Sequence, residues 1–81
     1  MPVVRLVAFA RLRELFGERR EIALPEGAKV GDLWDTLLRE EPHASALARG
    51  LRFARNGALC GAETALCEGD EISLLPPFGG G

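Results

Sequence analysis

The spacing of apolar residues changes along this chain, and each change predicts a different element. Residues 3–10 (VVRLVAFA) are almost continuously apolar and rich in Val, which predicts a central, largely buried β-strand. Residues 11–16 place apolar side chains at i, i+3 and i+4, which predicts a short helix that Gly17 is suited to end. Polar and apolar residues then alternate over 21–24 up to Pro25, which predicts a second strand paired with the first like a hairpin.

The clearest helix is predicted to follow Lys29. Five apolar residues fall at i, i+3, i+4, i+7 and i+8 and form one face over two turns: Val30, Leu33, Trp34, Leu37 and Leu38. Asp32 in the first turn suits the helix dipole, but Lys29 stands where Ser or Thr would cap a helix better. Pro42 predicts that the helix ends at about Glu41.

The second half of the chain predicts three further short strands. The Ala-rich residues 43–50 could add one more helical turn, and residues 51–56 alternate as in a half-buried strand. An Asn-Gly pair at 56–57 is a strong tight-turn signal, so residues 58–61 are expected to return as a short strand. Residues 71–75 (EISLL) predict the last strand.

The order of these elements predicts the fold class. Four to five strands around one main helix make an α+β arrangement, and a mixed sheet wrapped around one helix is the β-grasp solution. The first and last strands are the most apolar, so we expect them side by side in the middle of the sheet. We expect residues 1–76 to form the β-grasp domain and residues 77–81 to form a flexible C-terminal tail.

Composition narrows the functional classes. A chain of 81 residues makes one domain and is too small for a conventional enzyme cleft. Its net charge of −2 argues against nucleic-acid binding. No apolar run reaches the ~18 residues of a membrane span and no signal segment opens the chain, so we expect a cytoplasmic protein that does not act at a membrane. Cys60 and Cys67 are then expected to be reduced structural thiols, because their spacing matches no common metal or redox motif.

Side chains typical of catalysis are scarce. His43 is the only histidine, so the chain cannot build a Ser-His-Asp triad of the usual kind from neighbouring motifs. Neighbouring acids on a helix or strand point apart, so we expect Glu40 with Glu41, and Asp70 with Glu71, to be solvated surface charges. We expect no metal site and no bound cofactor.

The chain end has no ordinary structural role. It consists of Pro76, Pro77, Phe78, Gly79, Gly80 and Gly81. The two prolines favour an extended path and cannot donate to a sheet, Phe78 is a large apolar residue beyond the core, and the glycines carry no side chains. A stiff arm with a thin end suits insertion into a partner's narrow tunnel, although a frayed terminus is the simpler alternative. The α-carboxylate is inert until activated, so the tail looks like a substrate for another enzyme.

Four segments give the chain a family resemblance. They are residues 8–17 (AFARLRELFG), 25–33 (PEGAKVGDL), the Asn-Gly turn at 56–57, and residues 68–81 (EGDEISLLPPFGGG). Together they resemble the small subunits of molybdopterin synthase, the MoaD family of ubiquitin-like sulfur carriers. The Gly-Gly ending alone is weak support, because thiamine-pathway carriers, tRNA-thiolation carriers and ubiquitin share it. This chain also ends in three glycines where the family pattern needs two.

The resemblance implies a specific chemistry. A ubiquitin-activating-type adenylyltransferase uses ATP to form an acyl adenylate on Gly81, and a sulfur donor enzyme converts it to a thiocarboxylate. The tail then enters the large subunit of molybdopterin synthase, typically in a heterotetramer, and delivers sulfur to precursor Z. The carrier is the non-catalytic subunit and binds no cofactor of its own.

The resemblance also suggests roles for other residues. Pro77 and Phe78 would fill an apolar groove of the partner. Four arginines on the predicted exposed sheet face could steer docking onto an acidic partner, although they could equally be solvated: Arg5, Arg11, Arg52 and Arg55. Two alternatives stay open, namely a related carrier for thiamine, tRNA thiolation or protein modification, and a β-grasp binding module with an inert tail.

Overall fold

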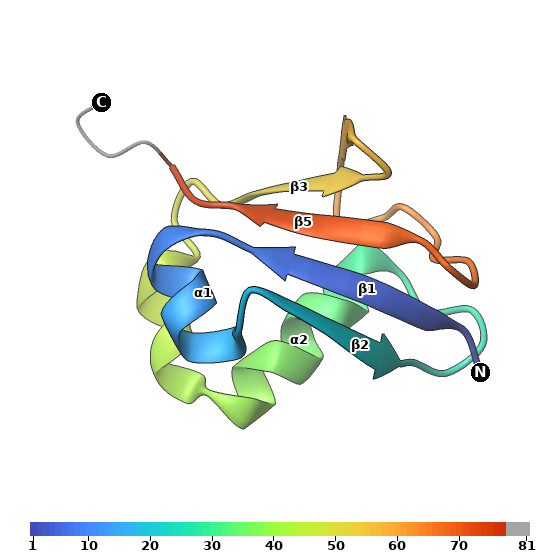
Figure 1. The fold of residues 1–81 in the computed structure, drawn as a ribbon, viewed down its shortest axis with the longest axis horizontal. Helices are drawn as coiled ribbons and strands as arrows, with labels where there is room; N and C mark the ends of the chain where they lie inside the picture. Colours follow the sequence, from blue (N-terminus) through green and yellow to red (C-terminus); the bar gives the residue numbers. More distant parts are fainter. Residues whose placement is uncertain (78–81) are drawn as a thin grey trace.

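The computed structural model describes residues 1–77, and all its helices and strands lie between Val3 and Leu75 (Figure 1). In chain order they are β1 (Val3–Ala8), α1 (Ala10–Phe16), β2 (Arg19–Ala23), α2 (Val30–Glu40), the 3₁₀ helix η1 (Pro42–Leu47), β3 (Arg52–Arg55), β4 (Ala58–Cys60) and β5 (Glu71–Leu75). None of the helices in this part of the chain is long and apolar enough to cross a membrane.

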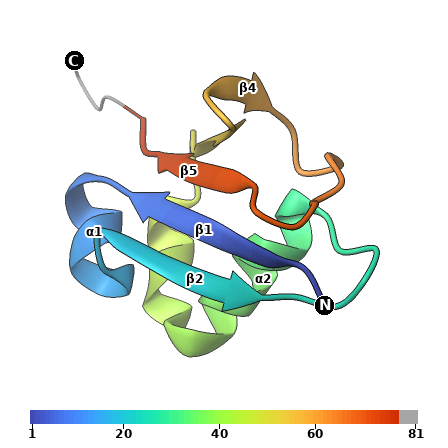
Figure 2. The same ribbon diagram turned by 45° about the vertical axis from the view of Figure 1, so that its right-hand side comes forward.

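The strands form one mixed sheet in the order β2-β1-β5-β3-β4. β1 and β5 pair in parallel, whereas β2 pairs with β1, and β3 with β4 and β5, in antiparallel fashion. The first and last strands are therefore neighbours within the sheet, as the sequence predicts. Figure 2 shows β2, β1 and β5 side by side, with both helices on one side of them. This is the predicted β-grasp arrangement.

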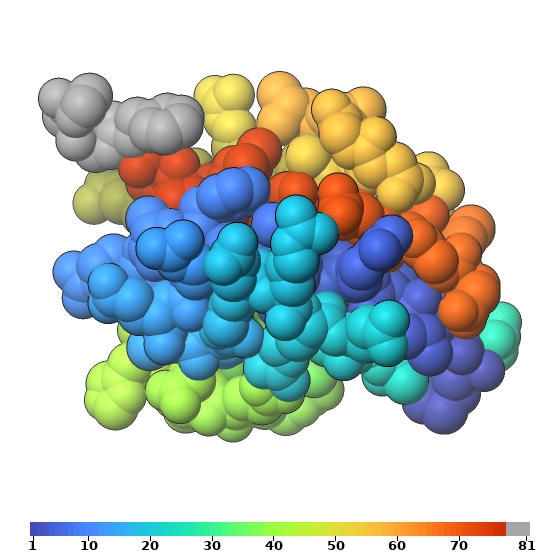
Figure 3. All heavy atoms as spheres, viewed as in Figure 1, coloured from blue at the N-terminus to red at the C-terminus, as the bar shows by residue number. Residues whose placement is uncertain are grey.

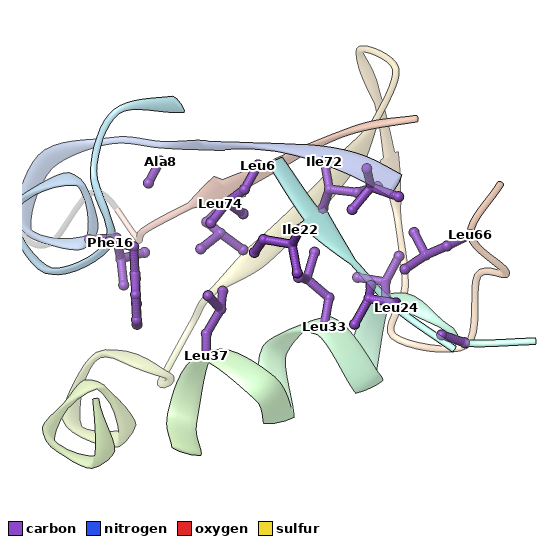
Figure 4. Packing of buried hydrophobic residues seen from close by; sticks show 14 of the residues in the cluster. Leu6, Ala8, Phe16, Ile22, Leu24, Leu33, Leu37, Leu66, Ile72 and Leu74 are labelled. Atoms are coloured by element: carbon purple, nitrogen blue, oxygen red, sulfur yellow. The ribbon is translucent and has the colours of Figure 1, made fainter. Parts of the chain in front are cut away.

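The core lies between the sheet and the helices. Leu33 and Leu37 of α2 are fully buried and point towards Leu6 and Leu74 of the two central strands (Figure 4). At one edge of this aliphatic layer, the rings of Phe16 and Trp34 meet edge to face with centroids 6.4 Å apart. Such a core holds the helices on one face of the sheet and leaves the other face, called the outer face here, to solvent.

Two predicted strand boundaries were wrong. β1 ends at Ala8, because the chain turns into α1 at Ala10, which has a positive φ of 54°. β2 begins at Arg19 although the predicted strand starts at residue 21, because the backbone of 19–20 pairs with β1. The guanidinium of Arg20 then reaches across to α2 and donates two 2.9 Å hydrogen bonds to the Glu40 carboxylate. Strand extent is thus decided by the pairing partner rather than by local polarity.

The start of α2 is better capped than Lys29 suggests. The backbone N–H of Lys29 donates to Oδ2 of Asp32 at 2.8 Å. The next two N–H groups, of Val30 and Gly31, donate to the carbonyls of Thr64 and Ala62, both at 2.9 Å. The first N–H groups of the helix therefore find partners in a distant loop. At the other end the helix stops at Glu40, and the Ala-rich segment forms η1, as predicted.

Candidate functional site

The predicted tail begins where the central strand β5 ends. β5 runs beside β1 up to the pair Leu74–Ala8 and ends at Leu75, after which Pro76 is half-buried and Pro77 is exposed. In Figure 3 the red atoms at this end lie at one corner of the molecule, next to blue atoms of the N-terminal segments. The other tail residues of the predicted site lie outside the described residues: Phe78, Gly79, Gly80 and Gly81.

Two hollows flank Pro76 and Pro77. The first, of about 650 Å³, is lined largely by apolar side chains of the β1–α1 connection and η1, among them Phe9 and Leu47. The second, of about 610 Å³, is lined by the loop before β3 and by Leu59. Leu75 and both prolines line the two hollows together. The two prolines therefore form a ridge between two concave surfaces.

Large exposed apolar side chains border this ridge. Phe9 is 46% exposed and Leu59 is 65% exposed, which is unusual for such residues in a small domain. We define the tail-base surface as Phe9, Leu59, Leu75, Pro76 and Pro77. Sequence reasoning missed Phe9 and Leu59, because each reads as an ordinary strand residue, and only the fold brings them to the same end of β5.

The four candidate arginines do not share one face. Arg5 and Arg52 are exposed on the outer face, where their partners in the strand register are Glu71 and Leu75. Arg11 lies on α1 and lines the first hollow, so its assignment to the sheet was wrong. The assignment of Arg55 to the outer face was also wrong.

Arg55 is committed to an internal ion pair instead. It pairs in register with the buried Ile72, on the helix side of the sheet, and its Nε donates to Oδ2 of Asp70 at 2.8 Å. This hydrogen bond, together with the charge of Asp70, raises the pKa of Arg55. Arg55 Nη2 also lies 4.0 Å from the Sγ of Cys67, and both cysteines are free thiols.

Asp70 was predicted as a surface charge, and the structure buries it. It is 5% exposed and accepts hydrogen bonds from Arg55 Nε, the Cys67 N–H and Asn56 Nδ2 at 2.8–3.0 Å. Asn56 Oδ1 in turn accepts the Glu71 N–H at 2.9 Å. Burial raises the pKa of Asp70, but these hydrogen bonds and the charge of Arg55 outweigh it, so the pKa lies below its ordinary value. The cluster ties the β3–β4 turn to the start of β5.

The described residues hold no conventional catalytic arrangement. His43 lies in η1, and residues 1–77 contain no group of three or more His, Cys, Asp or Glu side chains that could hold a metal ion. What the fold provides is a rigid central strand that leads directly into a proline ridge with exposed apolar residues around it. These features define the class as a β-grasp domain that presents its C-terminal segment beside an apolar surface.

Comparison with known proteins places the chain within that class. Residues 6–81 match the ThiS family, and the chain belongs to it. It is 30% identical to the molybdopterin synthase sulfur carrier subunit of Mycobacterium tuberculosis, with 100% of both chains covered.

Solved structures share the fold. Small archaeal modifier protein 1 of Haloferax volcanii superposes with a TM-score of 0.80 at 30% identity, over 98% of this chain and 99% of that one. The complex of subunits 1 and 2 of the molybdopterin-converting factor of Helicobacter pylori matches with a TM-score of 0.68 at 28% identity, over 98% and 99%.

Proposed function

We propose that this protein is the sulfur carrier of a molybdopterin synthase. The observation that carries the proposal is the proline ridge at the end of β5, which leads the chain towards Gly81 beside an exposed apolar surface. Family membership supports it, as does the 30% identity over the full length to a named sulfur carrier subunit. The small core leaves catalysis to larger partners.

The proposed chemistry takes place on the carboxyl group of Gly81. The carboxylate attacks the α-phosphate of ATP, and pyrophosphate leaves, which gives an acyl adenylate. A sulfur nucleophile then attacks the acyl carbon and AMP leaves, so that a thiocarboxylate forms. ATP is bound by the activating adenylyltransferase and the sulfur comes from a donor enzyme. The thiocarboxylate finally delivers sulfur to precursor Z, held by the large subunit of the synthase.

The described residues support this chemistry by presentation. Pro76 and Pro77 fix their φ angles and offer no N–H groups, so the sheet ladder ends and the chain continues in a defined direction. The tail-base surface can bury apolar area against a partner while the tail enters that partner's site. Phe78 and the two glycines before Gly81 extend the arm by a few residues, at most about 3.5 Å each.

The test is intact-mass spectrometry after incubation with the adenylyltransferase of the same genome, MgATP and sulfide. We expect a mass gain that corresponds to replacement of one oxygen by sulfur at the C-terminus. A variant that lacks Gly81 should keep its fold by circular dichroism and gain no sulfur. An unmodified wild-type chain, or full sulfur uptake by the shortened chain, would refute the proposal.

A protein-modifier role is the second candidate, favoured by the likeness to small archaeal modifier protein 1. In that case the activated Gly81 carbonyl would form an amide with an amine of another protein and release AMP. Tagged protein from the native cells distinguishes these roles. Recovery of a molybdopterin synthase large subunit supports the carrier role, whereas covalent conjugates to other proteins support the modifier. A tRNA-thiolation or thiamine complex would point to a different sulfur acceptor.

A further inference from the structure

Gly50 lies directly against the proline ridge. It occupies the third position of the turn 48–51, which is closed by a 3.0 Å hydrogen bond from the Leu51 N–H to the Ala48 carbonyl. A Cβ atom on Gly50 would lie 2.9 Å from Cβ of Pro77 and 3.2 Å from its Cγ. Figure 1 shows this yellow loop before β3 beside the red end of the chain after β5. No side chain fits between the turn and Pro77 without displacing one of them.

The strand register explains why these two residues meet. β3 and β5 pair in antiparallel fashion up to Arg52 and Leu75. Gly50 and Pro77 each lie two residues beyond that pair, so they occupy opposing positions at the next step of the ladder. Pro77 has no N–H to donate and Gly50 has a φ of +74°, so the ladder ends there and the residues meet in van der Waals contact.

The turn has little freedom to move away. It follows η1, whose end is held by the hydrogen bond from the Ala48 N–H to the Ser45 carbonyl at 3.1 Å. η1 is anchored by Ala44, which is fully buried, and the turn leads directly into β3 at Arg52. A side chain at position 50 would therefore push Pro77 rather than the turn.

A second turn shows that positive φ alone does not account for this contact. Gly27 also occupies the third position of a four-residue turn, closed by a 3.1 Å hydrogen bond from the Ala28 N–H to the Pro25 carbonyl. Its φ is +83°, but a Cβ there would meet nothing within 4 Å. Both positions favour glycine for the backbone, and only position 50 needs it for close approach.

We infer that Gly50 is a positioning residue for sulfur loading, because its missing side chain sets the direction in which the chain leaves Pro77. The inference rests on the proposed sulfur-carrier function. Proline fixes its own φ, so a displacement of Pro77 changes the direction of every residue beyond it. The reacting carbonyl of Gly81 is four residues further on, and a misplacement of about 1 Å there can cost on the order of 100-fold in rate.

The test compares Gly50→Asn with the matched control Gly27→Asn. Asparagine tolerates positive φ better than other residues with a side chain, so both variants carry a similar backbone cost and differ at Pro77. Steady-state thiocarboxylate formation is measured with the activating adenylyltransferase, MgATP and sulfide. We expect kcat of Gly50→Asn to fall on the order of 10–100-fold, with the KM for the carrier little changed because the tail-base surface is intact. Gly27→Asn should match the wild type in both constants.

Two other results would overturn the inference: a kcat for Gly50→Asn equal to the wild type, or an equal loss in both variants. A second readout does not depend on activity. Nuclear Overhauser contacts between the Gly50 α-protons and the Pro77 ring should appear in the wild type and in Gly27→Asn, and should be lost in Gly50→Asn while β5 signals persist. If the wild type forms no thiocarboxylate, the proposed function fails by itself. The absence of these contacts in the wild type would refute the positioning role directly.

Discussion

At the scale of single residues, the buried carboxylate of Asp70 carries the most energetic weight. It binds the side chains of Arg55 and Asn56 and the backbone of Cys67, so one residue joins β3, its turn and the approach to β5. Local sequence could not predict this role, because the partners lie up to fifteen residues away and Asp-Glu pairs are usually solvated. Gly50 was missed for the same reason, since its contact with Pro77 depends on a distant strand register.

Replacement of Asp70 by Ala should destabilise the fold by about 2–3 kcal/mol at pH 7. The substitution removes charged hydrogen bonds and leaves the Cys67 N–H and the Asn56 amide without their acceptor. Urea unfolding followed by circular dichroism measures the loss. Glu71→Ala is the matched control, because its carboxylate accepts no hydrogen bond from the other described residues, and it should change stability by less than about 0.5 kcal/mol. Equal effects in both variants would contradict the buried role of Asp70.

The same comparison has a defined pH dependence. The folded pKa of Asp70 lies below its model value of 3.8, so its ionised form contributes stability that is fully present above the unfolded pKa. That contribution is lost as pH falls through the folded pKa. The stability difference between wild type and Asp70→Ala should therefore be constant near neutrality and shrink below about pH 4. A difference that grows towards acid pH would reverse the assigned direction.

At the scale of elements, hydrophobic spacing predicted more than the ends of the elements. The five-residue apolar face placed α2 to within one residue at each end, because an amphipathic helix must turn that face to the core. Its capping was not predictable, since two of its first N–H groups bind carbonyls more than thirty residues away in the chain. The start of β2 was missed because pairing with β1 overrides the polarity of two arginines.

The Asp32 cap gives a prediction at this scale. Asp32→Ala removes the acceptor of the Lys29 N–H and a negative charge from the positive end of the helix dipole. We expect a loss of about 1 kcal/mol in unfolding free energy, measured by urea titration. Asp35→Ala, one turn removed from the cap, serves as control and should change stability by less than about 0.5 kcal/mol. If both variants unfold alike, the hydrogen bond to Lys29 does not stabilise α2.

At the scale of the whole molecule, the outer face is divided along the strands. Away from the tail, the register aligns Glu21, Arg5 and Glu71 in one charged row across β2, β1 and β5. Towards the tail, the row that contains Val7, Ala54 and Leu59 is apolar apart from Arg19 and Ser73. The sequence predicted the fold and the chemical end of the chain, but it could not show that Phe9 and Leu59 converge on that end. That convergence arises only from the crossover that places β5 between β1 and β3.

The tail-base surface predicts a separation of binding from folding. Leu59 is 65% exposed, so Leu59→Ser should leave the melting temperature almost unchanged, because little apolar area is lost from the core. If the proposed large subunit covers this side chain, the same change should weaken its binding by about 2 kcal/mol, or about 30-fold in Kd. Isothermal titration calorimetry with the large subunit measures the effect. Leu15→Ser on α1, where Leu15 is 36% exposed and lines neither hollow, should lower stability slightly and leave Kd unchanged. Unaltered binding by Leu59→Ser would remove this face of the sheet from the interface and leave the tail alone to hold the partner.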